Sequence, residues 1–148
     1  MTEHRSDDKP SVGARESGGV EGKTPYDLLG GSEKVRAIAM KFYDHMSEHE
    51  PALARLHPCD ETGNVLPEPR ERFALFFIGW LGGPQDYIEK HGHPRLRRRH
   101  AHVLVDVAMR DAWIRSMTAA LDAENVTGPL RTFLDGRLFE VADFLRNA

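Results

Sequence analysis

The sequence predicts an all-α fold in a single domain, and three observations carry that prediction. Apolar residues recur at spacings of three and four along most of the chain, which is the period of an amphipathic helix. No segment shows the alternation of apolar and polar residues that is typical of a strand. The 148 residues are enough for one domain to bury a core without disulfides or a structural metal.

Composition and charge narrow the functional classes. The chain is 40% hydrophobic and 29% charged, as is usual for a globular protein, and its formal net charge of −3 argues against a general nucleic-acid binder. No run approaches the roughly 18 apolar residues of a membrane span, and the start lacks the apolar core of a secretion signal. Cys59 is the single cysteine, so no internal disulfide can form. We expect a cytoplasmic location.

The first 23 residues (MTEHRSDDKPSVGARESGGVEGK) differ in composition from the rest of the chain. They are polar and rich in Gly and Ser, and they hold too little apolar surface to offset the entropy lost on ordering. The sequence therefore predicts a disordered tail over residues 1–23 and one domain over residues 24–148.

The sequence of the first part of the domain predicts three helices. A short helix over Pro25 to Leu29 ends at Gly30-Gly31. The next runs from Ser32, a suitable N-cap, to Glu48. Pro51 then opens a third short helix through Leu56, which ends before Pro58. The apolar face of the second helix consists of Val35, Ile38, Ala39, Phe42 and Met46.

The middle of the domain predicts a loop, a helix and an irregular stretch. Gly, Asn, Asp and Pro residues indicate a loop over Cys59 to Pro67. A helix over Glu68 to Leu81 follows, and Gly82-Gly83-Pro84 ends it. The basic segment HGHPRLRRRH is expected to be helical only near Leu96 to His100. The helix before it carries an aromatic stripe of Phe73, Phe76, Phe77 and Trp80.

The last third of the chain predicts two further helices. One extends from Asp106 to about Glu124 and buries apolar residues around Ala112, Met117 and Leu121. Thr127 is a candidate cap for the final helix. The apolar residues that the final helix is expected to bury are Leu130, Phe133, Leu134, Leu138, Val141 and Leu145.

Three features together point to a cofactor site. Tyr43 lies on an apolar helix, the aromatic stripe provides flat apolar surface, and His100 follows Arg95, Arg97, Arg98 and Arg99. Taken singly, each is typical of a core or of a solvated face. Haem accounts for all three, because the macrocycle needs apolar walls, its propionates need cations and its iron needs an imidazole.

An ordered set of motifs resembles the group II truncated haemoglobins. Gly82-Gly83-Pro84-Gln85-Asp86-Tyr87 leads into GHPRLRRRH, which ends at His100, and Trp113 follows in RDAWIRSM. The segments PYDLLGG and KFYDHM are similar to the start and the distal helix of that family. The resemblance covers about Thr24 to Leu145, and the block from Gly82 to Met117 is its specific part.

The resemblance implies a two-over-two helical sandwich around haem b. Matched position by position, His100 is the proximal iron ligand, while Tyr43 and Trp113 are distal hydrogen-bond donors to a bound gas. Arg99 and Tyr87 are candidate partners of the propionates, although Arg99 could equally be a solvated surface residue. Phe73, Phe76 and Phe77 are expected to contact the macrocycle.

Two histidines depart from the family pattern. His57, in LHP, stands where many relatives carry Tyr or Phe. It can donate a hydrogen bond to a bound ligand, coordinate iron as a sixth ligand, or only pack over the haem edge or face water. His102, in HAHVLV, is a competing proximal imidazole. His100 is preferred because its spacing to both the Gly-Gly-Pro motif and Trp113 fits the family.

The implied function is binding of dioxygen, carbon monoxide, nitric oxide or peroxide at haem iron. Several donors around the ligand favour slow release, and hence a redox or detoxifying role over bulk oxygen transport. Peroxidase-like chemistry or chemistry on nitric oxide and reactive nitrogen species would use Tyr43, His57 and Trp113, with an unidentified reductase. We expect a monomer or weak dimer with neither nucleic-acid nor membrane partners.

Two other classes stay open at this stage. His91, His93, His100 and His102 could bind zinc or another divalent ion without haem. The domain could also be a helical interaction module that has no cofactor.

Overall fold

The computed structural model describes residues 22–148, and within them it contains helices and no strand. The tail expected over residues 1–23 falls, for residues 1–21, outside the described part. The all-α prediction is confirmed. The helices are α2 (Pro25–Leu29), α3 (Ser32–His49), α4 (Pro51–Ala54), α5 (Pro67–Trp80), α6 (Asp86–His91), α7 (Leu96–His100), α8 (Val107–Ala123) and α9 (Gly128–Phe144).

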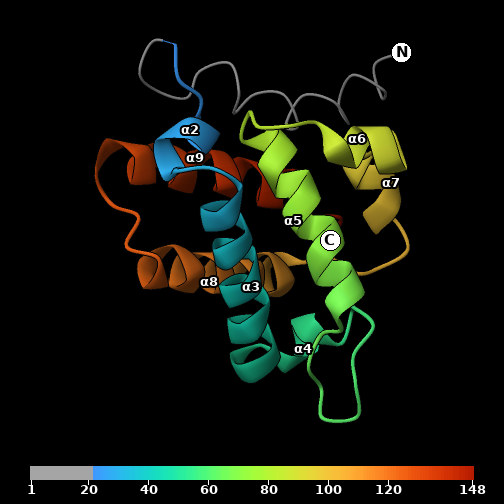
Figure 1. Ribbon diagram of the computed structural model, residues 1–148. Helices are drawn as coiled ribbons and strands as arrows, with labels where there is room; N and C mark the ends of the chain where they lie inside the picture. Colours follow the sequence, from blue (N-terminus) through green and yellow to red (C-terminus); the bar gives the residue numbers. More distant parts are fainter. Residues whose placement is uncertain (1–21) are drawn as a thin grey trace.

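Two pairs of long helices form the body of the domain. Figure 1 shows α3 and α5 running steeply across α8 and α9, and α3 packs against both α5 and α8. The faces that the sequence predicts as apolar meet in this core, with Ile38 and Phe42 of α3 against residues such as Met117 of α8. This is the two-over-two arrangement that the resemblance implies. No helix between residues 22 and 148 is long and apolar enough to span a bilayer.

The Gly82-Gly83 pair lets the start of the domain pack against the end of α5. The Tyr26 amide donates to the Leu81 carbonyl at 2.9 Å, which brings α2 onto this turn. A Cβ on Gly82 would lie 2.6 Å from the Thr24 Cβ, and one on Gly83 would lie 2.5 Å from the Tyr26 ring. The motif is therefore a steric requirement of this contact as well as a helix terminator.

The structure corrects the start of one helix and adds another. Gly31, at φ 100°, is the N-cap of α3, and it makes no side-chain capping bond. The expected cap, Ser32, is the first helical residue, and its hydroxyl pairs with that of Tyr26 at 2.8 Å. Helix α6 lies in a stretch that the sequence predicts to be irregular, because in its six residues only Tyr87 is buried.

Candidate functional site

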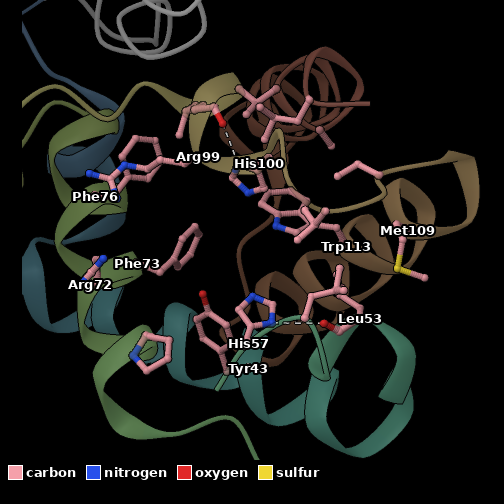
Figure 2. A pocket seen from close by; sticks show the side chains of 18 of the residues that line it. Tyr43, Leu53, His57, Arg72, Phe73, Phe76, Arg99, His100, Met109 and Trp113 are labelled. Atoms are coloured by element: carbon pink, nitrogen blue, oxygen red, sulfur yellow. Dashed lines mark hydrogen bonds between the residues drawn. The ribbon is translucent and has the colours of Figure 1, made fainter. Parts of the chain in front are cut away.

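A cavity of about 410 Å³ opens between the two helix pairs. Residues of every helix from α3 to α9 line it, together with the segment after α4 and the loop between α7 and α8. Its surface is mostly apolar, and side chains that carry chemistry project into it (Figure 2). Among the expected site residues, those on its wall are Tyr43, His57, Phe73, Phe76, Tyr87, Arg99, His100 and Trp113.

His100 ends α7 with one ring nitrogen already engaged. Its Nδ1 lies 2.7 Å from the Leu96 carbonyl oxygen. A carbonyl only accepts, so Nδ1 carries the proton and donates, and in the neutral ring the Nε2 lone pair stays free. Burial is the largest cause that lowers the pKa of His100, which keeps the ring neutral near pH 7. An oriented neutral imidazole on a cavity wall is suited to bind a metal.

His57 has the same tautomer at another part of the wall. Its Nδ1 lies 3.2 Å from the Leu53 carbonyl oxygen and 3.3 Å from that of Ala54. Burial is again the largest cause that lowers its pKa. Figure 2 shows His57 beside Tyr43, across the cavity from His100. A neutral His57 therefore offers the cavity a lone pair at Nε2 and no proton.

Tyr43 and Trp113 supply the proton donors. Tyr43 is 4% exposed, and burial raises the pKa of its hydroxyl well above the usual value, so the hydroxyl stays protonated. Figure 2 shows that hydroxyl directed into the cavity. Within residues 22–148, neither the Tyr43 hydroxyl nor the Trp113 indole N–H has a hydrogen-bond partner. Both donors are free to meet a ligand.

Aromatic rings form one side of the cavity, with one exception to the expectation. Phe73 and Phe76 lie on the wall, and Tyr87 packs edge-on against Phe76 with the ring centroids 5.7 Å apart. Phe77 does not line the cavity. It is 1% exposed and stacks behind Phe73 at 5.4 Å, so its expected contact with the cofactor becomes a packing contact in the core.

Cations stand at the edge of the cavity. Arg99 is exposed and lines it, with Nε donating to the Pro94 carbonyl at 2.7 Å. Arg72 also lines it, which the sequence analysis does not predict. Its Nη2 pairs with Glu68 at 2.8 Å, while its buried Nε has no partner among the described residues. The signal that could have found Arg72 is its position next to Phe73.

The end of the chain holds the wall that follows His100. The Asn147 amide donates to the Val105 carbonyl at 2.8 Å, and its side-chain Nδ2 donates to the Val103 carbonyl at 2.8 Å. The Val105 amide in turn donates to the Asn147 Oδ1 at 2.9 Å. Val103 and Val105 both line the cavity. We call these three bonds the Asn147 clamp; the sequence analysis does not predict it.

The histidine metal site considered above finds no support in this geometry. His102 is exposed and lines the cavity near His100, but no three His, Cys, Asp or Glu side chains of residues 22–148 gather as a metal-binding group. The residues present fit haem better. The wall offers flat apolar surface, two oriented imidazole nitrogens, and arginines that could pair with carboxylates.

Comparisons with known proteins agree with this geometry. A sequence model of the family described as bacterial-like globin matches residues 24–147. The group 2 truncated hemoglobin YjbI of Bacillus subtilis is 36% identical over 114 residues, which cover 77% of this chain and 81% of that protein.

Solved structures are similar over nearly the whole domain. The cold-adapted truncated hemoglobin of the Antarctic bacterium Pseudoalteromonas haloplanktis is 40% identical, with a TM-score of 0.78 over 85% of this chain and 99% of that one. The group II truncated hemoglobin of Bacillus anthracis is 33% identical, with a TM-score of 0.77 over 84% of this chain and 97% of that one. The truncated oxygen-avid haemoglobin of Bacillus subtilis is 34% identical, with a TM-score of 0.76 over 84% and 100%.

Proposed function

This chain belongs to the bacterial-like globins, and among them to the group II truncated haemoglobins. From this membership we propose that it retains its gas ligand for redox or detoxifying chemistry. As a globin it binds haem, and diatomic gases at the haem. The proposal adds haem b as the cofactor, His100 as its proximal ligand, and retention in place of bulk oxygen transport. One solved relative is described as oxygen-avid, which agrees with retention.

The observation that carries the proposal is the pair of free donors, the Tyr43 hydroxyl and the Trp113 indole N–H. When bound, haem supplies an iron that can bind a diatomic ligand and can gain or lose one electron. Negative charge that develops on such a ligand would be poorly solvated against these apolar walls. Donors already in place stabilise that charge without reorganising, so they favour slow release and activation of the ligand.

In this proposal His57 accepts a hydrogen bond or binds iron through its Nε2, and it does not donate a hydrogen bond to the ligand. With its Nδ1 proton directed to backbone carbonyls, its Nε2 can accept from the Tyr43 hydroxyl or bind iron as a sixth ligand. Arg99, Arg72 and Tyr87 would hold the haem propionates. Peroxidase-like chemistry and chemistry on nitric oxide or reactive nitrogen species both fit this donor set, and both need an external reductase.

The first test is the visible spectrum of the purified protein, ferric, then dithionite-reduced, then with carbon monoxide. A Soret band that shifts with carbon monoxide is the expected result, and no Soret band after haem is offered would overturn the proposal. A low-spin ferrous spectrum that His57→Leu converts to high spin would identify His57 as a sixth ligand. His100→Ala should abolish the normal coordination while His102→Ala keeps it, and the reverse would move the proximal role to His102.

Replacing Tyr43 with phenylalanine should speed dioxygen dissociation about tenfold or more. The substitution removes one hydrogen bond to a partly charged ligand, worth roughly 1.5–3 kcal/mol, with little change of shape. Stopped-flow displacement of dioxygen by carbon monoxide measures the rate. Tyr26→Phe is the matched control, because the Tyr26 hydroxyl pairs with Ser32 away from the cavity. An unchanged rate in Tyr43→Phe would assign the retention to Trp113, the other free donor of the cavity.

A further inference from the structure

Positive charge is concentrated around α7. Between Glu89 and Asp106 the chain contains one lysine, four arginines and no acidic residue, although the whole chain has a formal net charge of −3. Three of these arginines are consecutive and exposed, namely Arg97, Arg98 and Arg99, and we refer to them as the α7 arginines.

The α7 arginines differ from most other arginines of the described domain in having no acidic partner. Within the described part of the chain, none of the three forms an ion pair. Of the arginines that the structure describes outside residues 90–105, only Arg55 shares that property. The paired ones are Arg36, Arg70, Arg72, Arg110, Arg115, Arg131, Arg137 and Arg146. The charge of the α7 arginines is thus not neutralised by an acidic side chain of the described residues.

The α7 arginines divide between the cavity and the solvent. Arg99 lines the cavity, and the proposed function assigns it to a propionate. The guanidinium of Arg97 lies over the Phe144 ring, 4.9 Å from its centroid, which directs it toward the end of α9. The Arg98 side chain has no hydrogen bond, ion pair or ring contact within residues 22–148. Arg97 and Arg98 belong to the same short helix, α7, from which His100 faces the cavity. They therefore lie close to the proposed haem site.

We propose that Arg97 and Arg98 form a docking surface for a small acidic one-electron carrier protein, which reduces the haem. This inference rests on the proposed function, which requires an external reductase. In the step itself the reduced carrier loses one electron and the ferric iron gains it, so no bond forms and no proton moves. A local cationic surface next to the site attracts an acidic face and orients it there.

The charge distribution favours an acidic protein over a polyanion. A nucleic acid or an anionic membrane would extend past α7 and meet the rest of a chain whose formal net charge is −3. A small protein with a compact acidic face needs to cover only the exposed end of α7 and the neighbouring end of α9. Electron transfer also requires only a brief encounter, which a few screened charges can provide.

The experiment is stopped-flow reduction of the ferric haem-loaded protein under carbon monoxide, which traps the ferrous form. The electron donor is a small acidic [2Fe–2S] ferredoxin, reduced beforehand and freed of excess reductant. Ionic strengths of about 0.01 M and 1 M, with Debye lengths of roughly 30 and 3 Å, bracket the electrostatic contribution. We expect the second-order rate constant to fall at least about tenfold between them.

Two substitutions with the same change of charge separate the local surface from the net charge. Arg98→Glu, which loses no contact within the described residues, should slow the reaction about threefold or more at low salt and weaken its salt dependence. Arg55→Glu, on the C-cap of α4 and away from α7 in Figure 1, should leave the rate within error of the wild type. Arg97→Gln/Arg98→Gln removes both charges with less disturbance, and far-ultraviolet circular dichroism confirms its folding.

The outcomes distinguish this inference from the function on which it rests. Equal rates for wild type and Arg98→Glu, with a normal ferrous carbon monoxide spectrum after dithionite, would overturn the docking surface and leave the proposed function standing. If dithionite also gives no such spectrum, the proposed function fails as well. Binding of phosphatidylglycerol vesicles or RNA that Arg98→Glu abolishes, without any salt-sensitive reduction, would assign the surface to a polyanion and overturn the proposal.

Discussion

The cavity residues differ in where they keep their protons. Burial raises the pKa of Tyr43, so its hydroxyl remains a donor, while burial lowers the pKa of His57 and His100, so both rings are neutral. Both histidines direct their Nδ1–H to backbone carbonyls of their own segments. At neutral pH the cavity therefore presents two lone pairs and two donors. The lone pair of His100 lies on one side of the cavity, and that of His57 lies with the Tyr43 hydroxyl on the other.

Local sequence patterns identify the residue types of the site but not their orientation. The resemblance to the group II truncated haemoglobins singles out His100, and the structure has this side chain on the cavity wall. The adjacent Phe76 and Phe77 could not be separated, because both lie on the broad apolar face of α5, and the packing of α5 against α3 decides which of them faces the core. The tautomer of His57 depends on carbonyls at the end of α4, which no spacing rule includes.

Low pH should break the ion pair between Arg115 and Glu50. The Arg115 Nε and Nη2 donate to the two Glu50 oxygens at 2.7 and 2.8 Å, and these bonds are the largest cause that lowers the pKa of Glu50. Because the folded-state pKa lies below the ordinary value, the stabilisation is present above the unfolded pKa. It is lost as the pH falls through the folded pKa. Arg115 is largely exposed, so the pair is worth at most about 1 kcal/mol.

Urea denaturation of Glu50→Gln checks this expectation. The variant should be less stable than the wild type at pH 7, and the difference should shrink as the pH falls below about 4.5, the usual value for a glutamate. Glu61→Gln, in the exposed loop after α4, should show no difference at any pH. A deficit in Glu50→Gln that persists unchanged into acid would mean that the pair does not stabilise the fold.

At the scale of elements, contacts between helices decide boundaries that local signals leave open. Ser32 carries the signature of a cap, yet its hydroxyl bonds to Tyr26 and leaves Gly31 as the cap. Helix α6 has no amphipathic period to detect, because Tyr87 alone anchors it. The long helices were predictable because their apolar faces extend over several turns. The short ones depend on what they pack against.

Gly83→Ala should destabilise the fold through the contact between α2 and α5. Its new methyl group would lie 2.5 Å from the Tyr26 ring, and overpacking of this kind costs roughly 1–3 kcal/mol. Gly136→Ala in α9 is the opposite case, since no atom lies within 4 Å of its new Cβ, and it should stabilise by about 0.5–1 kcal/mol. Thermal unfolding compares the two. If Gly83→Ala leaves the Tm unchanged, α2 must be able to shift away from the turn after α5 at no energetic cost.

For the whole molecule, the cavity makes haem a structural component. A ligand that binds only the folded chain adds stability by mass action, roughly 4 kcal/mol when present at a thousand times its dissociation constant. Removing haem should therefore lower the Tm by more than about 10 °C. Calorimetry of the apo and haem-loaded proteins measures this difference. Addition of EDTA to the haem-loaded protein should leave the Tm unchanged, whereas a loss would revive a divalent metal site.

The Asn147 clamp connects the residues after α9 to the segment that follows His100. Anything attached after Ala148 can pull on Asn147, and through three hydrogen bonds on Val103 and Val105. A segment fused after Ala148 is thus expected to affect this part of the cavity wall. Asn147→Ala should release haem faster to an acceptor protein and speed hydrogen exchange at the Val105 amide. Through these bonds, a change at Asn147 is expected to alter how firmly the cavity holds haem.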